Sequence, residues 1–297
     1  MMRYKMAYCT LNSVVQQLNA GSNTVDVTTT SAENIQIALE SANFLAYTTR
    51  LIYEVSAIMS SVMQHVFVPY RNTLTLKRNQ LRRALVKYPT EWQLQLSEEI
   101  LELHSVNWLG STLDIDLVWL SFNGEFYPDV AIGIDILANI TLPYIASQTV
   151  QIDGTFGYHR NPDAMFLDTG KEVQDDPLSS SSTSLTVNSS GGSSFEILQY
   201  LRLEDEYVLV TAINADVLTV ERGVNGTTAV AHVQGTTIEK FIPLPEIENE
   251  ARRIVKRHWE LKGWPETAFI VSPEEVIEIN PNAIQQIVKP LPFMGSV

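Results

Sequence analysis

Residues 207–241 read YVLVTAINADVLTVERGVNGTTAVAHVQGTTIEKF. In the first run, YVLVTAI, the residues on each of the two strand faces are partly apolar. A strand that is apolar on both faces is usually buried on both of them, by another sheet or another subunit. Asn-Ala-Asp, Asn225-Gly226 and Gly235 supply turn signals between the runs. The stretch therefore predicts antiparallel strands, in a β-module whose pattern is clear from about Leu185 to Phe241.

The same stretch contains three residues of reactive type, Arg222, His232 and Glu221. One interpretation is that they form a reactive site. The other is structural: His232 packs among its apolar neighbours and bonds to backbone, and Arg222, beside Gly223, donates hydrogen bonds to loop carbonyls. We favour the structural interpretation, because nothing in the spacing of the five histidines indicates that they converge.

Composition limits the classes of function. The chain has 297 residues, 45% of them hydrophobic, which suffices for two or three modules. Its net charge of −14 argues against DNA binding over the whole surface, since phosphate binding needs clustered Lys and Arg. We expect no membrane span and no signal peptide, because no long apolar run occurs. The single cysteine, Cys9, excludes an intrachain disulfide and a cysteine-based metal site within one chain.

Helical patterns lie towards both ends of the chain. We expect a short helix over residues 10–19 and a long one over 31–65, which Thr30 and Glu33 start as a capping box. The apolar stripe of the long helix comprises Ala38, Ala42, Leu45, Ile52, Val55, Met59, Val62 and Val66, with Thr48 filling a gap.

A further helix is predicted over residues 246–262, with Pro245 in its first turn and Gly263 at its stop. Its inner face consists of Ile247, Ala251, Ile254, Val255 and Trp259. Its basic face consists of Arg252, Arg253, Lys256 and Arg257. This basic face is either solvated and paired with Glu248 and Glu260, or it contacts an acidic partner surface or DNA phosphate.

Together these patterns predict an α+β fold. N-terminal and C-terminal helices form a helical bundle, β-rich, sandwich-like modules are inserted between them, and an extended C-terminal tail follows. The expected boundaries are 1–68 for the N-terminal helical part, 69–163 for the first β-module, 164–243 for the second with a mobile loop at 168–194, 244–263 for the returning helix and 264–297 for the tail.

Catalytic and metal-binding motifs are absent from the sequence. It contains no phosphate-binding loop, zinc-protease motif or nucleophile elbow. Asp114 and Asp116 lie two apart on an expected strand, where they form either a carboxylate pair or, as we favour, a solvated face. The acidic run 168–176 lacks the spacing of a calcium loop. We therefore expect no enzyme activity, no cofactor and no metal.

The run from Glu204 to Phe241 resembles a recurring β-segment of tailed-phage virion proteins. The matching residues are Glu206, Val210, Leu218, Thr219, Val220, Arg222, Gly223, Val224, Asn225, Gly226, Thr227, Ala229, His232, Gly235 and Ile238. The opening YCTLNSVVQQL, the run VQIDGTFGY and the run LPEIENEARRIVKRHWELKG resemble, in this order, segments of the head–tail connector or portal adaptor family.

This resemblance implies a structural virion protein in the phage neck, assembled in the host cytoplasm. Such adaptors form a ring, usually of twelve subunits, between the portal protein and the tail, terminator or nozzle proteins. Genomic DNA passes through the lumen without specific binding, and a negative lumen suits this passage because it repels the polyanion.

Two other functions compete with this one. A tail-fibre or baseplate β-protein would bind carbohydrate through aromatic side chains, for which the candidates are Trp108, Trp119, Tyr127 and Tyr144. A glycosidase would use carboxylates, for which the candidates are Asp114, Asp116 and Glu125.

The tail combines five prolines with many apolar residues, so it is suited neither to one regular helix nor to remaining in water. We expect it to bury its apolar side chains on its own β-module or, as we favour, on the portal or an adjacent subunit. Besides the basic face, the candidate partner contacts are Trp264, Ile277, Ile279, Ile287 and Phe293.

Overall fold

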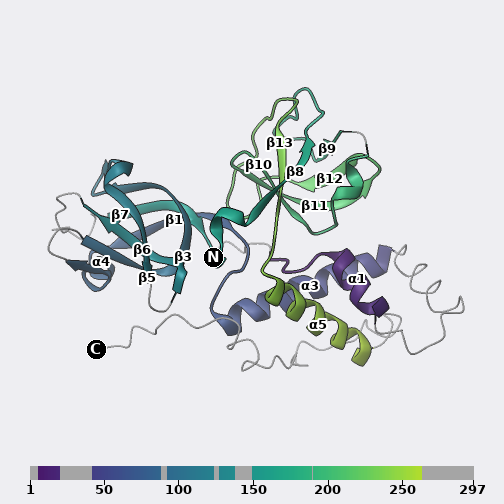
Figure 1. Cartoon of the computed structure of the whole chain (residues 1–297), viewed down its shortest axis with the longest axis horizontal. Coiled ribbons are helices and arrows are strands. Elements are labelled where there is room, and N and C mark those ends of the chain that lie inside the picture. Colours follow the sequence, from purple (N-terminus) through teal and green to yellow (C-terminus); the bar gives the residue numbers. More distant parts are fainter. Residues whose placement is uncertain are drawn as a thin grey trace, which may run out of the picture. The chain divides into compact units, whose positions relative to one another are not determined.

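A computed structural model of the chain describes residues 6–20, 42–87, 92–123, 127–137, 149–188 and 190–262. The described residues form thirteen strands, four α-helices and three short 3-10 helices (Figure 1). They divide into two compact units. The first comprises the described residues of 1–64, 166–224 and 228–297, and the second those of 65–165 and 225–227.

The prediction of a helical bundle with inserted β-modules is wrong, because two antiparallel sheets make up most of the regular structure. Helices α1 (Leu11–Ala20), α3 (Ala42–Met63) and α5 (Pro245–Lys262) do pack together in the first unit, but they form one layer beside its sheet (Figure 1). The fourth helix, α4 (Arg78–Ala84), belongs to the second unit. The sequence interpretation recognised two β-modules but took them as insertions into a bundle, whereas their sheets are the main part of the fold.

The sheet of the first unit has six strands in the order β8-β13-β10-β11-β12-β9. The strands are β8 (Phe166–Glu172), β9 (Ser184–Thr186), β10 (Tyr200–Leu203), β11 (Glu206–Asn214), β12 (Val217–Glu221) and β13 (Thr237–Phe241). An antiparallel bridge between Val173 and Val187, directly after β8 and β9, joins the two ends of this order. The sheet therefore closes on itself, and its edges are protected from pairing with other chains.

A continuous apolar core fills this closed sheet. It contains Val173, Leu178, Leu185, Val187, Phe195, Leu201, Leu203, Val208, Val210, Leu218, Val220 and Ile238. The first five residues of β11, from Glu206 to Val210, are all buried. Val208 and Val210 belong to the core, while Tyr207 stacks on Phe166 with 5.5 Å between the ring centroids. The expectation that this strand is buried on both faces is confirmed for its first half.

Residues 168–194 differ from the loop expected there. They contain most of β8, all of β9 and the 3-10 helix η3 (Gly192–Ser194). Polar contacts replace the missing apolar alternation: the Asp175 carboxylate accepts hydrogen bonds from the backbone N–H of Thr186 at 2.7 Å and from its hydroxyl at 3.0 Å. Serine-rich composition concealed this structure, because side-chain to backbone hydrogen bonds leave no periodic pattern in a sequence.

The helices agree with their predicted apolar faces in most positions. Thr48, Ile52, Val55 and Met59 of α3 are buried, as expected, whereas Val62 is 37% exposed. Ile247, Ala251, Ile254 and Val255 of α5 are buried, which confirms its inner face. The predicted capping box at Thr30 and Glu33 lies outside the described residues.

The second unit contains the other sheet, in the order β1-β7-β3-β6-β5 with β2 and β4 paired to β3. Its strands are β1 (Tyr70–Lys77), β2 (Leu85–Lys87), β3 (Trp92–Trp108), β4 (Ser111–Thr112), β5 (Val118–Asn123), β6 (Tyr127–Ile136) and β7 (Thr149–Phe156). Two more 3-10 helices are η1 (Ile115–Leu117) and, after β7, η2 (Pro162–Ala164). The runs WQLQL and ILELHSV both lie in the single long strand β3.

The turn at residues 225–227 belongs to the second unit, although β11 and β12 before it belong to the first. The Asn225 carbonyl accepts a hydrogen bond from the backbone N–H of Arg71 at 2.7 Å, and its side-chain amide donates to the Pro69 carbonyl at 3.2 Å. Asn225 and Gly226 both have positive φ, as the Asn-Gly turn signal predicts. A Cβ on Gly226 would lie 2.1 Å from the Arg71 carbonyl oxygen.

This close approach gives the first prediction. Gly226→Ala combines the strain of a positive φ with a backbone clash, whereas Gly235→Ala, at φ +87 against +84, meets nothing within 4 Å. The control should cost about 1–2 kcal/mol, and Gly226→Ala clearly more. Urea unfolding of both variants measures the difference. Equal losses would show that the turn moves away from β1 without cost.

Candidate functional site

The carboxylate of Glu206 is the centre of the polar cluster formed by the opening stretch. Its side chain is 0% exposed, although it carries a charge. Oε1 accepts hydrogen bonds from Nε of Arg222 at 2.7 Å and from the backbone N–H of Gly223 at 2.9 Å. Oε2 accepts from Nη2 of Arg222 at 2.7 Å and from the backbone N–H of Val230 at 3.0 Å. The arginine and carboxylate thus form a bidentate pair, the strongest ion-pair geometry in proteins.

Arg222 extends this cluster to three backbone carbonyls. Nη1 donates to the carbonyls of Ser179 and Ser182 at 3.0 and 3.2 Å, and Nη2 donates to that of Val230 at 2.6 Å. The guanidinium thereby connects the end of β12 to the loop between β8 and β9 and to the segment that leads to β13. The interpretation of Arg222 as a structural donor to loop carbonyls is confirmed.

The imidazole of His232 lies between two carboxylates. Nε2 is 2.9 Å from Oε2 of Glu206, and Nδ1 is 2.9 Å from Oε2 of Glu204. The backbone of His232 also exchanges two hydrogen bonds with Leu178. The prediction that His232 is packed is confirmed, since its side chain is 0% exposed, but the predicted bonding of the ring to backbone is wrong, because both ring nitrogens contact carboxylates.

Glu206 and Glu204 have roles in this cluster that sequence reasoning missed. Leu203 and Glu206 pair across a two-residue turn, which keeps both glutamates at one end of the sheet. Glu221, which was considered instead, lies near Tyr53 of α3: burial and the Glu221 carboxylate raise the pKa of Tyr53 to about 12. The available signal was the short spacing of Glu204 and Glu206 at the start of a strand.

The environment of Glu206 keeps it ionised. Burial by itself would raise the pKa of Glu206, but the hydrogen bonds from Arg222, Val230 and His232 outweigh it and hold the pKa below its usual range. The stability that this carboxylate contributes is therefore present above the usual carboxyl pKa and is lost as pH falls through the lowered folded value. A carboxylate saturated with donors and closed to solvent acts as a structural anchor and not as a base.

Glu206→Gln should strongly destabilise the first unit. The substitution keeps the shape of the side chain but leaves the Arg222 charge buried without its bidentate partner, which costs about 3–5 kcal/mol. Chemical denaturation at pH 7 measures the loss.

Glu204→Gln is the matched control, because Glu204 contacts the same histidine but its side chain is 63% exposed. We expect this variant to lose less than about 1 kcal/mol. A Glu206→Gln protein as stable as the Glu204→Gln protein would contradict the central place of Glu206.

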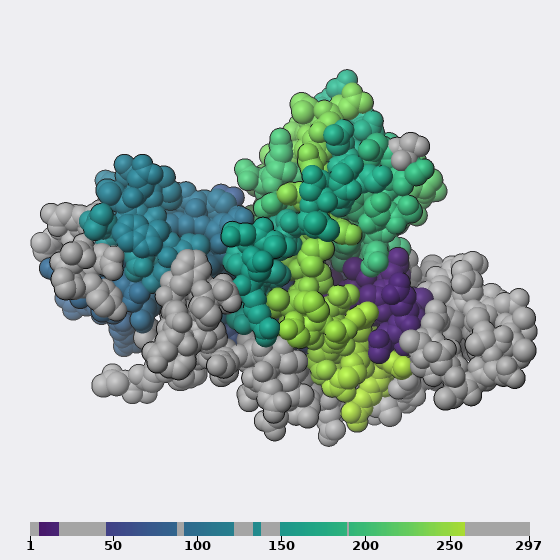
Figure 2. Space-filling view, in the orientation of Figure 1, coloured from purple at the N-terminus to yellow at the C-terminus, as the bar shows by residue number. Residues whose placement is uncertain are grey.

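The predicted basic face of α5 is partly engaged within the helix. Arg253 forms two hydrogen bonds with the Glu250 carboxylate, at 2.8 and 2.5 Å, and Arg252 donates to the side chain of Asn249. Arg253 and Arg257 are exposed, whereas Arg252 and Lys256 are half-buried. Figure 2 shows the outer surface of α5 in yellow-green. Internal pairing therefore exists: Arg253 pairs with Glu250, which was not expected, and the Arg252 charge acts on the expected Glu248, while the side chain of Glu260 lies outside the described residues.

The other sequence candidates do not come together. The strand expected for Asp114 and Asp116 is not formed: Asp114 caps η1, and its Oδ1 accepts the backbone N–H of Asp116 at 3.1 Å. Both aspartates are exposed. Trp108 is buried, and Trp119 is 40% exposed. The candidates that lie outside the described residues are Glu125, Tyr144, Trp264, Ile277, Ile279, Ile287 and Phe293.

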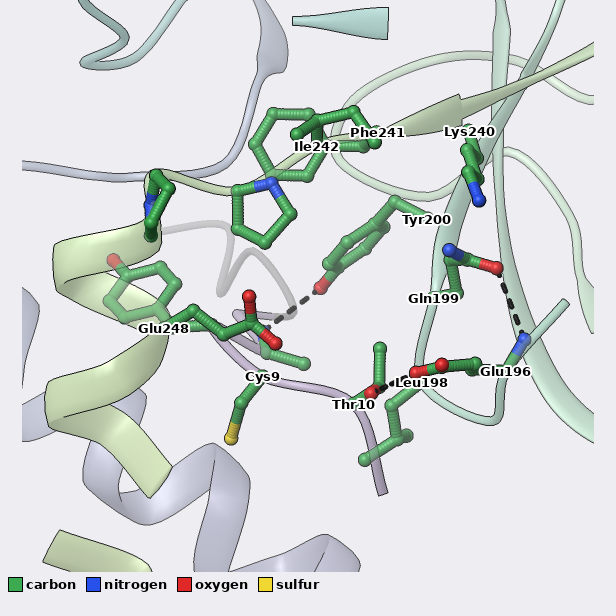
Figure 3. A pocket seen from close by; sticks show the side chains of 14 residues that line it. Cys9, Thr10, Glu196, Leu198, Gln199, Tyr200, Lys240, Phe241, Ile242 and Glu248 are labelled. Carbon is green, nitrogen blue, oxygen red and sulfur yellow. Dashed lines mark hydrogen bonds between the residues drawn. The ribbon is translucent and has the colours of Figure 1, made fainter. Parts of the chain in front are cut away.

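A pocket of about 220 Å³ lies in the first unit, between the segment before α1, the segment before β10, the end of β13 and the first turns of α5. Its polar lining includes Glu196, Gln199, Tyr200, Lys240 and Glu248. Figure 3 shows the Glu248 side chain extending from α5 into the pocket, towards the hydroxyl of Tyr200. That hydroxyl accepts a hydrogen bond from the backbone N–H of Ala7 at 3.2 Å.

Two groups in this pocket have perturbed acidities. Burial raises the pKa of Glu248, and the Glu196 carboxylate raises it further, against the opposing effects of Arg252 and Ser13. Burial also raises the pKa of the Cys9 thiol far above its usual range, with a further contribution from Glu248. Cys9 is therefore a protonated, unreactive thiol, and Glu248 carries its charge at a cost in stability.

Replacing Glu248 by Gln should remove that cost. A raised folded pKa means that the folded chain binds this proton more tightly than the unfolded chain, whose carboxyl titrates near 4.5. The natural protein therefore loses stability as pH rises from 4.5 through the folded pKa.

Scanning calorimetry at pH 7 should give a higher melting temperature for Glu248→Gln than for the natural chain, and the difference should shrink below pH 4.5. Glu246→Gln, in the same helical turn but outside the pocket, serves as the control. A lower melting temperature for Glu248→Gln at pH 7 would mean that the charge stabilises the fold.

Comparison of the chain with protein-family models, curated proteins and solved structures finds no match. Within the part of the chain that the structure describes, no three His, Cys, Asp or Glu side chains are grouped as metal ligands. None of the described helices has the length and apolarity needed to cross a membrane. The site residues and the sequence resemblance are thus the basis for a functional proposal.

Proposed function

We propose that this chain is a structural virion protein of a tailed phage, a subunit of the adaptor ring that joins the capsid portal to the tail. The main support for the proposal is what the residues of the resembling motif do in the structure. Val210, Leu218, Val220 and Ile238 pack in the core of the closed sheet. Glu206, Arg222 and His232 bind one another at one end of it.

This use of the motif favours a structural role over catalysis. Its ionisable groups are buried and bonded to one another and to backbone, so none is presented to a substrate. A glycosidase needs two carboxylates placed on either side of a scissile bond. Asp114 instead uses its carboxylate to hold a turn, and Asp116 is exposed within the same turn.

Charge supports the proposed place in the particle. A chain with a net charge of −14 repels DNA, which suits a channel wall that DNA must pass without binding. Arg253 and Arg257 are exposed cations on α5 and are candidates for contact with an acidic portal surface. Such contacts act mainly on association and are weakened by salt.

Mass measurement of the purified protein together with particle images tests the proposal. We expect a twelvefold ring of the 33.3 kDa chain, alone or on isolated portal rings. A trimer would favour the tail-fibre alternative, and a monomer that turns over a glycoside would contradict the structural role.

A charge-reversal pair tests the portal contact. Arg253→Glu with Arg257→Glu should weaken attachment to portal rings, most strongly at low salt. Arg82→Glu with Arg83→Glu makes the same change in net charge at two exposed positions of α4 and should leave attachment unchanged. Equal attachment of both double variants at low salt would remove α5 from the interface.

A further inference from the structure

The pocket beside α5 has a composition that the adaptor role does not explain. Two carboxylates, Glu196 and Glu248, line it from separate elements, and the Glu196 charge contributes to raising the pKa of Glu248. Glu196 accepts a hydrogen bond from the hydroxyl of Thr10, and its backbone N–H donates to Oε1 of Gln199 at 3.1 Å. Figure 3 shows both contacts and places Glu248 across the pocket from them. One wall is therefore held in place before any ligand arrives.

Glu248 is the unusual member of this lining. It is a carboxylate that folding places in a half-buried position near a like charge, and its pKa is raised by burial. Ionisable side chains whose position lowers the stability of the fold are typical of binding and catalytic sites. An incoming cation would relieve this cost, because it would stabilise the half-buried charge beyond what Arg252 and Ser13 already do and would offset the Glu196 charge.

We propose that this pocket binds a monoalkylguanidinium group, the group that an arginine side chain carries. The lining itself contains these two carboxylates and one ammonium group, Lys240, while Arg252 acts on Glu248 from outside the lining. Guanidinium is planar and has five N–H donors, so it can bind both carboxylates and the Tyr200 oxygen at once. Binding of this group does not require the virion role.

The size of the pocket restricts the ligand further. Its 220 Å³ is below the ~300–1,000 Å³ typical of pockets for drug-sized ligands. This space is suited to a single side chain or a small cation rather than to a nucleotide or a sugar chain.

Titration calorimetry at pH 7 and low salt, with N-propylguanidinium as the ligand, tests this binding. We expect saturable 1:1 binding by the full chain. The neutral planar isostere N-propylurea should bind at least about tenfold more weakly, because it lacks the charge. Equal affinity for the two ligands, or no saturable binding of N-propylguanidinium, would overturn the proposal.

Variants of the pocket distinguish a loss of binding caused by the removed charge from a loss caused by misfolding. Glu248→Gln should weaken binding at least about tenfold while its thermal transition stays at or above that of the natural chain. Lys240→Met should strengthen binding about threefold, because it removes a like charge from the lining. Glu246→Gln should bind as the natural chain does. Unchanged affinity in both Glu248→Gln and Lys240→Met would contradict a cation site.

Binding of the peptide acetyl-Gly-Arg-Gly-amide shows whether the guanidinium group comes from an arginine side chain or from a free compound. Affinity equal to that of N-propylguanidinium indicates an arginine carried on a partner chain. Binding of the small ligand without the peptide indicates a free guanidine compound. Either result supports guanidinium recognition. Tighter binding of n-butylammonium than of N-propylguanidinium would show that the pocket is built for a primary amine instead.

Discussion

The buried ion pair between Glu206 and Arg222 is the interaction on which the first unit depends. Glu206 begins β11 and Arg222 follows β12, while the carbonyls that Arg222 binds belong to the loop after β8 and to the segment before β13. The carboxylate–guanidinium pair thus contacts four parts of the closed sheet, in addition to the backbone hydrogen bonds that pair β11 with β12 and Leu178 with His232. A buried charge strongly lowers the stability of the fold unless all of its partners are present. We therefore expect the cluster to form completely or not at all. It therefore favours one register of the strands around the core.

The same arrangement explains why a motif rich in Arg, His and Glu is not reactive. Each group that could transfer a proton is already bonded to an opposite charge or to backbone, and Glu206 and His232 are closed to solvent. Residues 225–227 follow directly and belong to the second unit, where Gly226 lies against β1. The pocket beside α5 has the opposite character: its Glu248 is only half-buried, and burial there opposes ionisation. Features that suggest binding therefore lie away from the motif.

Sequence reasoning identified elements whose pattern is local. The core face of α5 and the turn at Asn225-Gly226 follow from residue spacing and from turn chemistry, and both are present. It failed for the features that depend on contacts between residues far apart in the sequence. Strand β8 pairs with β13 some seventy residues later, and its polar side chains give no alternation to detect. Glu206 appears in the sequence as one more acidic residue before a strand, because its partner Arg222 becomes visible only when β11 and β12 are paired. The pocket was missed for the same reason: Glu196 and Glu248 are far apart in the chain.

Hydrogen exchange of two backbone amides tests most directly whether the Glu206 cluster locks the segments at one end of the closed sheet. The N–H groups of Gly223 and Val230 lie outside the strands and donate to the Glu206 carboxylate. If the cluster is a structural lock, these amides exchange only through global unfolding, with protection equal to that of the central strand β11. Exchange at the rates of exposed loop amides, while β11 stays protected, would show that the cluster opens independently and would contradict its role as a structural lock.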